Sequence, residues 1–177
     1  MCRVNDDNLQ WLNDEETETW LNVWSFYVWL PTRLDAQLKR DHGISHYDYF
    51  AMARISMADD GRLRMSELAA QSDMTLSHLS RVVTRLENQN WVRRVPDPAD
   101  GRSTFAELTE SGWDLVRAAA PGHVREVRRL FFDHLTPEES HQVGEAMKKI
   151  VVGLRPQKEQ EGEKERSGHG SEPTPDP

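Results

Sequence analysis

The sequence predicts a mainly α-helical fold that carries one small β-hairpin. Several segments repeat apolar residues at the three- and four-residue spacing of a helix, and most of them follow a residue that caps helices. Two runs of strand-forming residues, 91–95 and 103–108, flank a turn-rich stretch, which is typical of a hairpin. The expected order is helix, helix, short strand, helix, helix, strand, strand, helix, helix.

Length and composition favour one domain with appendages. The 177 residues hold 22 Lys and Arg against 30 Asp and Glu, for a formal net charge of −8. No stretch reaches the roughly 20 apolar residues of a membrane span, and no secretory signal precedes the first helix. The single cysteine, Cys2, excludes an intramolecular disulfide. We therefore expect a cytoplasmic protein with no membrane contact, a flexible segment over 1–13 and a disordered tail over 156–177.

The first helix is expected over about residues 14–40. An apolar stripe with spacings of three and four residues consists of Trp20, Trp24, Tyr27, Pro31, Leu34 and Leu38. Other apolar residues cover most of the remaining circumference, and such a helix must be buried on more than one side. One domain of this size can hardly surround its own first helix, so the pattern predicts a partner chain. Pro31 should kink or interrupt the helix.

Three shorter helices are expected next. Ser45 and Asp48 form a capping box for the second, the third spans 66–72, and Thr75 caps a fourth that runs to about Gln89. The predicted inward face of the second helix is Tyr47, Phe50, Ala51, Ile55 and Ala58. The predicted inward face of the fourth is Leu79, Val82, Val83 and Leu86, which leaves its polar residues exposed.

The last two helices follow the hairpin, whose loop over 96–102 is expected to be long. Thr109 caps the first of them, which should bend or break at Pro121–Gly122 and end near His134. The segment 136–139 then supplies an N-cap threonine, a proline at the first helical position and a glutamate at the third. This last helix should run to about residue 154.

Two short helices followed by a hairpin with a basic tip make a winged helix-turn-helix. Residues 62–102 are the only positively charged part of the chain, with seven arginines against five acidic residues. The second helix of such a pair fits the major groove of DNA. Hydroxyls, imidazoles and guanidiniums on its outer face suit base edges and phosphates. The candidate DNA-binding residues are Ser77, His78, Ser80, Arg81, Thr84, Arg85, Asp100 and Arg102.

Two of these candidates belong to the hairpin. Arg102 can enter the narrow minor groove of A·T-rich DNA, and Asp100 can hold its guanidinium by a bidentate pair. The alternative is that Asp100 and Arg102 only stabilise the hairpin turn. Arg94 is expected to support the hairpin and not to contact a base. Ser80 lies nearer the inward edge of its helix, and the alternatives for it are a phosphate contact or a local cap.

The run from Leu76 to Arg94, followed by residues 97–102 and by Leu-Thr-Glu-Ser-Gly at 108–112, resembles the MarR family of bacterial transcriptional regulators. Asp-x-Arg in the wing followed by Leu-Thr-x-x-Gly is the most specific part, and the architecture matches over about 14–155. Asn90 stands where the family usually has glycine, and asparagine can also adopt a left-handed cap.

The resemblance implies a winged-helix core at about 45–108 and a homodimer formed by helices at about 14–40 and 110–155. It also implies repression through a pseudo-palindromic operator of double-stranded DNA, relieved by a small, often aromatic, ligand bound between the dimerisation helices and the DNA-binding lobe. The candidate ligand-binding residues are Trp20, Trp24, Tyr27, His46 and Phe50. The plainer alternative is that these residues form core and dimer interface.

Other functions have weaker support in the sequence. The histidines do not assemble a tetrahedral metal site, so we expect no metal and no cofactor. Cys2 lies in an acidic stretch, which does not suit a low-pKa redox sensor. No motif of phosphate-binding, zinc-protease or nucleophile-elbow type is present, so the chain is not expected to be an enzyme. The remaining alternative is a winged helix that serves protein interaction or dimerisation without sequence-specific DNA binding.

Overall fold

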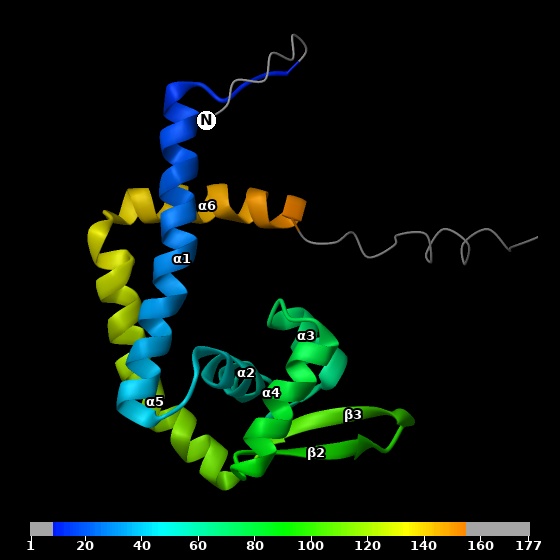
Figure 1. The fold of residues 1–177 in the computed structure, drawn as a ribbon. Coiled ribbons are helices and arrows are strands. Elements are labelled where there is room, and N and C mark those ends of the chain that lie inside the picture. Colours follow the sequence, from blue (N-terminus) through cyan, green and yellow to red (C-terminus); the bar gives the residue numbers. More distant parts are fainter. Residues whose placement is uncertain (1–8, 155–177) are drawn as a thin grey trace, which may run out of the picture. The chain divides into compact units, whose positions relative to one another are not determined.

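A computed structural model describes residues 9–154, apart from the side chain of Arg102 (Figure 1). The flexible N-terminus and the disordered tail expected from the sequence lie, except for residues 9–13, outside this range. The elements are α1 (Asp14–His42), α2 (His46–Ser56), β1 (Arg62–Arg64), α3 (Met65–Gln71), α4 (Leu76–Asn88), β2 (Val92–Asp97), β3 (Asp100–Leu108), α5 (Glu110–Leu130), the 3-10 helix η1 (Phe132–His134) and α6 (Pro137–Leu154). The predicted order of helices and strands is confirmed, with η1 added.

The chain forms two compact units, which divide after Asp133. The second unit contains α6, which begins with the predicted capping box: the Thr136 backbone N–H donates to Glu139 at 2.8 Å, and the Glu139 N–H donates back to the Thr136 hydroxyl. Every residue of α6 is at least partly exposed, and its apolar residues include Met147, Ile150 and Val151.

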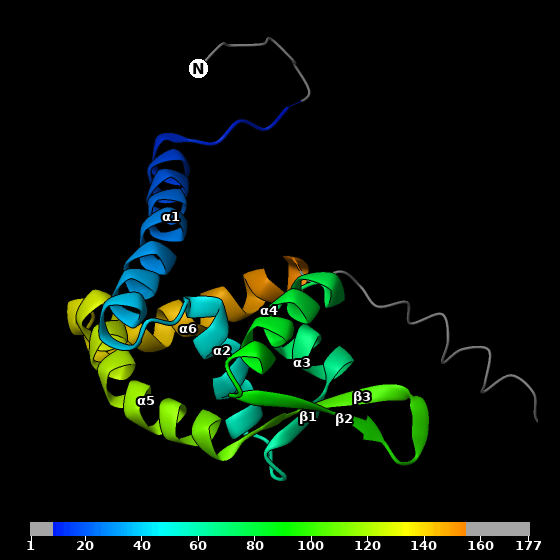
Figure 2. The same ribbon diagram turned by 60° about the horizontal axis from the view of Figure 1, so that its bottom comes forward.

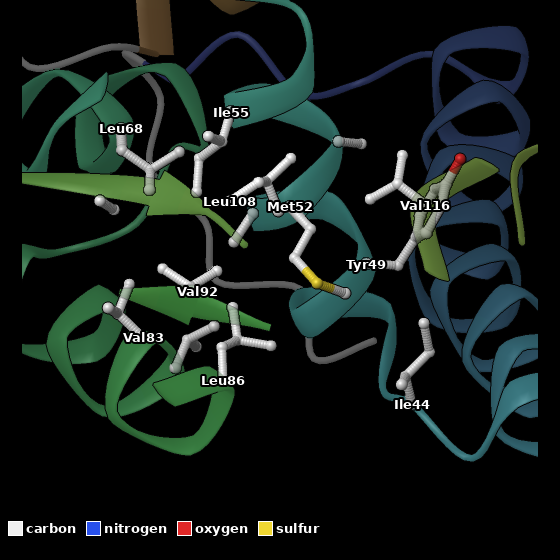
Figure 3. Close-up of a cluster of buried hydrophobic side chains, with 14 of the residues drawn as sticks. Ile44, Tyr49, Met52, Ile55, Leu68, Val83, Leu86, Val92, Leu108 and Val116 are labelled. Carbon is white, nitrogen blue, oxygen red and sulfur yellow. The ribbon is translucent and has the colours of Figure 1, made fainter. Parts of the chain in front are cut away.

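The core of the first unit lies between the helices α2, α3 and α4 and a three-stranded antiparallel sheet of order β1-β3-β2. Figure 3 shows Met52, Ile55, Leu68, Leu86 and their neighbours converging from these elements. The predicted inward face of α4 is confirmed, because its four apolar residues are fully buried. Figure 2 shows the β2–β3 hairpin extending beyond this core.

The predicted inward face of α2 is partly wrong. Ala51 and Ile55 are buried, but Tyr47 is 52% exposed, and Phe50 and Ala58 are only partly buried. The neighbouring stripe of Asp48, Tyr49 and Met52 is buried in their place. Both stripes have helical spacing, and α2 contacts α1, α3, α4, α5 and the sheet, so tertiary packing decides which stripe faces inward.

Neither internal proline breaks its helix. Helix α1 continues through Pro31 and α5 continues through Pro121–Gly122, so an interruption at either proline is excluded, and the predicted alternative of a kink or bend stays a prediction. Helix α1 packs along α5, and tertiary packing of this kind can outweigh the one backbone hydrogen bond that a proline removes. Gly122 belongs to this contact, because a Cβ there would lie 3.3 Å from the Gln37 amide nitrogen on α1.

The hairpin loop is much shorter than predicted. The strands extend to Asp97 and restart at Asp100, which leaves a turn of two residues, Pro98 and Ala99. The Asp97 carboxylate closes this turn by accepting the Ala99 backbone N–H at 2.9 Å. The turn-rich composition of residues 96–102 does not reveal that an aspartate side chain closes the turn after only two residues.

The junction between α4, β2 and α5 explains the Leu-Thr-x-x-Gly motif. Asn90 has a φ of 59°, which confirms its left-handed conformation, and its carbonyl accepts the hydroxyls of Thr109 and Ser111 at 2.6 and 2.7 Å. Gly112 lies directly under the carbonyl oxygen of Trp91, where a Cβ would overlap that oxygen. The motif therefore anchors the start of α5 to the end of α4.

We predict that Gly112→Ala lowers the free energy of unfolding by about 1–3 kcal/mol, because the added methyl group displaces the Trp91 backbone. Urea denaturation followed by circular dichroism measures this change. Gly101→Ala is the matched control, since a Cβ at Gly101 meets nothing within 4 Å. Equal stability of the two variants would contradict the packing role of Gly112.

Candidate nucleic-acid interface

The outer surface of α4 carries one polar ridge. Ser77, Arg81, Thr84 and Asn88 follow one another at helical spacing and are all exposed, opposite the buried apolar face. The Thr75 hydroxyl caps the helix by accepting the His78 backbone N–H at 3.2 Å. Within the described part of the chain the Arg81 guanidinium has no ion pair or hydrogen bond. Arg81 is thus available to an external acceptor.

One flank of the ridge faces α2. His78 and Arg85, seven residues apart, lie on this side of α4. The His78 ring meets Tyr47 of α2 edge-on, with centroids 4.9 Å apart. Arg85 binds the buried Asp48 carboxylate through Nε at 2.9 Å and Nη2 at 2.5 Å. These two candidate residues are therefore held by α2.

The opposite flank of the ridge faces the wing. The Arg94 guanidinium forms an ion pair with Glu87 and donates to the Ser80 carbonyl oxygen at 3.0 Å and to the Thr84 hydroxyl at 3.2 Å. The predicted supporting role of Arg94 is confirmed by these contacts. Ser80 is half-buried, and the Thr84 hydroxyl also donates to the Ser80 carbonyl oxygen, so both residues help to join helix and wing.

The wing, which is the β2–β3 hairpin, is fixed near its turn by a buried carboxylate that sequence reasoning did not find. Asp97 is 4% exposed and accepts Nε and Nη2 of Arg64 at 2.9 and 2.7 Å. The Ala99 N–H and Arg64 hold the pKa of Asp97 below its ordinary value. Asp100 accepts the Ser103 hydroxyl at 2.7 Å. The side chain of Arg102 is not described, so the pairing of Asp100 with Arg102 stays a prediction.

A cavity of about 730 Å³ borders the flank of α4 that faces α2. Its lining comes from α1, the start of α2, α4 and the α3–α4 turn: Pro31, Thr32, Asp35, Lys39, Ser45, His46, Tyr47, Phe50, Ser72, His78 and Arg85. Of the candidate ligand-binding residues, His46 and Phe50 meet here, with ring centroids 6.0 Å apart. Trp20, Trp24 and Tyr27 do not line the cavity and are exposed on α1.

The ionisable side chains Asp35, Lys39 and His46 of this cavity interact with one another. Partial burial would raise the pKa of Asp35, yet Lys39 and the His46 backbone N–H hold it below its ordinary value. Burial lowers the pKa of His46, against the opposing effect of Asp35, and also lowers the pKa of the neighbouring His123. Both imidazoles are therefore biased toward the neutral form.

Residues 9–154 contain no group of three or more His, Cys, Asp or Glu side chains placed to hold a metal ion. None of their helices is long and apolar enough to cross a membrane.

A helix-turn-helix of α3 and α4 beside a short hairpin defines a winged helix-turn-helix protein. A family model described as MarR family matches residues 49–104. Sco3205, a MarR family transcriptional regulator from Streptomyces coelicolor solved in complex with DNA, is 41% identical with a TM-score of 0.82, covering 86% of this chain and 96% of Sco3205. The chain belongs to the MarR family of transcriptional regulators, and it is accordingly a regulator rather than an enzyme.

Two further relatives are similar. AbsC, a MarR family transcriptional regulator from Streptomyces coelicolor, is 37% identical with a TM-score of 0.80, covering 83% of this chain and 99% of AbsC. The transcriptional repressor MprA of Escherichia coli (strain K12) is 23% identical over 126 residues, which are 71% of this chain and 70% of MprA.

Proposed function

We propose that the protein is a homodimeric repressor that binds a pseudo-palindromic operator and is released by a small aromatic ligand. The observation that carries the DNA-binding part is the exposed ridge of α4, with the unpaired Arg81 among the described residues. Sco3205, which shares the fold and 41% of the aligned residues, was solved with DNA bound. MprA, which bears the name of a repressor, supports the direction of regulation.

The apolar surface of α1 supports the homodimer. Side chains that would be core residues in an ordinary helix are exposed in the single chain: Trp20, Leu21, Val23, Trp24, Tyr27, Val28 and Trp29. A monomer seldom leaves so much contiguous apolar surface in water. A second copy that covers this surface would also supply a second α4. Each α4 would then act as a recognition helix, the helix that enters the major groove, and a two-fold symmetric operator requires two of them.

The cavity beside α4 supports the ligand. It combines aromatic rings with Lys39, which pairs with Asp35, and with Arg85, whose Nη1 has no partner among residues 9–154. This set of groups suits an aromatic acid or phenol. Because His78 and Arg85 belong to the recognition helix, a bound ligand would alter the position of that helix relative to its partner in the dimer. The two helices must lie about one DNA turn apart to read both half-sites.

We predict that Arg81→Ala weakens operator binding by about 1–3 kcal/mol. If Arg81 contacts a phosphate, the variant also releases about one counterion fewer, which lowers the slope of log affinity against log salt concentration. Fluorescence anisotropy on the DNA upstream of the gene, against a scrambled duplex at several salt concentrations, measures both effects. Arg93→Ala is the matched control, because Arg93 pairs with Glu107 away from α4.

If Arg81→Ala binds the operator with wild-type affinity, Arg81 does not belong to the DNA interface. Equal, weak binding of the wild type to both duplexes would favour the alternative of a winged helix that serves protein partners. Tight and selective binding by the wild type, lost with salt, would support the proposed function.

We predict that Trp24→Glu raises the dissociation constant of the dimer about tenfold or more, because it places a charge in an apolar interface. Light scattering coupled to gel filtration over a range of concentrations measures the dimer. Met57→Glu is the matched control, since Met57 is an exposed apolar residue of the DNA-binding lobe. A fully dimeric Trp24→Glu variant would place the interface elsewhere.

We predict that an aromatic acid such as 4-hydroxybenzoate releases the protein from its operator, and that Phe50→Ala raises the concentration needed for half-release about tenfold, through loss of an apolar contact. Titration of the acid into the fluorescent operator complex measures this. Met57→Ala, at an exposed apolar residue outside both the cavity and the α1 surface, should leave half-release unchanged. A ligand that binds and leaves operator affinity intact would refute this mechanism, because only differential affinity shifts a population.

A further inference from the structure

One buried carboxylate connects the DNA-binding helix to α2. The Asp48 side chain is 7% exposed, and its two oxygens serve two different elements. Oδ2 accepts the Ser45 backbone N–H at 3.1 Å and the Ser45 hydroxyl at 2.6 Å, which completes the cap of α2. Oδ1 accepts Nε and Nη2 of Arg85 at 2.9 and 2.5 Å.

The cap alone does not explain this arrangement. A capping carboxylate at a helix N-terminus functions while exposed to water, and Glu139 does so at the start of α6. Asp48 is instead buried against the recognition helix, where an ionised carboxylate is tolerated only with a close cationic partner. Arg85 is that partner.

Arg85 is held but remains accessible. Its side chain is 50% exposed, and the contacts to Asp48 use Nε and Nη2. In residues 9–154 the third nitrogen, Nη1, has no partner. A guanidinium fixed on one edge by a carboxylate keeps its remaining N–H groups in a set direction, as a free lysine or arginine would not.

We propose that Asp48 is a positioning residue for DNA binding: it fixes the Arg85 guanidinium at the α2 edge of the recognition helix, so that the remaining N–H groups meet one DNA phosphate in a set geometry. Phosphate contacts fix the register of a protein on the duplex. This inference rests on the proposed operator binding.

The test separates orientation from charge. Asp48→Asn keeps Arg85 and removes the negative charge that orients it. Operator affinity is expected to fall about tenfold. Affinity for a scrambled duplex should stay constant or rise, because a negative charge near the phosphates is lost. The measured quantity is the ratio of the two dissociation constants, obtained by anisotropy at fixed salt.

Two further variants identify the cause. Ser45→Ala removes the cap partner and leaves the Arg85 pair, so it should lower the melting temperature by a few degrees without changing the ratio. In an Arg85→Ala background, Asp48→Asn should have no further effect on the ratio, because nothing is left to position. An undiminished effect in that background would assign Asp48 to the cap alone and overturn the proposal.

The remaining outcomes are also decisive. If Asp48→Asn does not fold, Arg85→Lys replaces it, because lysine keeps the charge without the planar fork; an unchanged operator preference in Arg85→Lys would overturn the proposal. Wild-type affinity in Arg85→Ala would overturn it while operator binding through Arg81 stands. Absence of operator preference in the wild type would overturn the proposed function and this inference together.

Discussion

The burial of one face of α4 is the constraint on which the DNA-binding surface depends. Leu79, Val82, Val83 and Leu86 are fully buried between α2, α3 and the sheet, so the helix has only one rotation about its axis that satisfies the core. That rotation places Arg81 and its ridge outward. Ion pairs on both flanks, Asp48–Arg85 and Glu87–Arg94, then fix the helix against α2 and the wing. Core packing and surface presentation are thus two results of one amphipathic pattern.

The parts of the fold that were predictable are those with local causes. Capping boxes at Ser45 and Thr136 depend on residues three positions apart, and the α4 pattern repeats within one short helix. The continuity of α1 through Pro31 was not predictable in this way, because the local signal of a proline favours a break and tertiary packing can override it. The orientation of α2 likewise followed its tertiary neighbours rather than its own periodicity.

The candidate site likewise contains some features with local causes and others that depend on tertiary contacts. Exposure of Arg81 follows from the helix pattern and was expected. The partners of Arg85 and Arg64 were not, because Asp48 is 37 residues from Arg85 and Asp97 is 33 residues from Arg64. An arginine in a positive segment gives no sequence signal of whether it faces an internal carboxylate or an external phosphate. Only the fold distinguishes Arg81, which is free among the described residues, from Arg85, which is shared.

This difference resolves the apparent conflict between an acidic protein and a DNA-binding one. Net charge of the whole chain governs long-range repulsion, which salt screens within about 10 Å. Contact with phosphates depends on which guanidiniums are left without internal carboxylates at the surface. Two acidic residues of the central segment, Glu87 and Asp97, pair with arginines that hold the wing, and Asp48 of α2 pairs with Arg85 of α4. These carboxylates therefore stabilise the fold around α4, and Arg81 on the polar ridge keeps a positive charge that can meet a DNA phosphate.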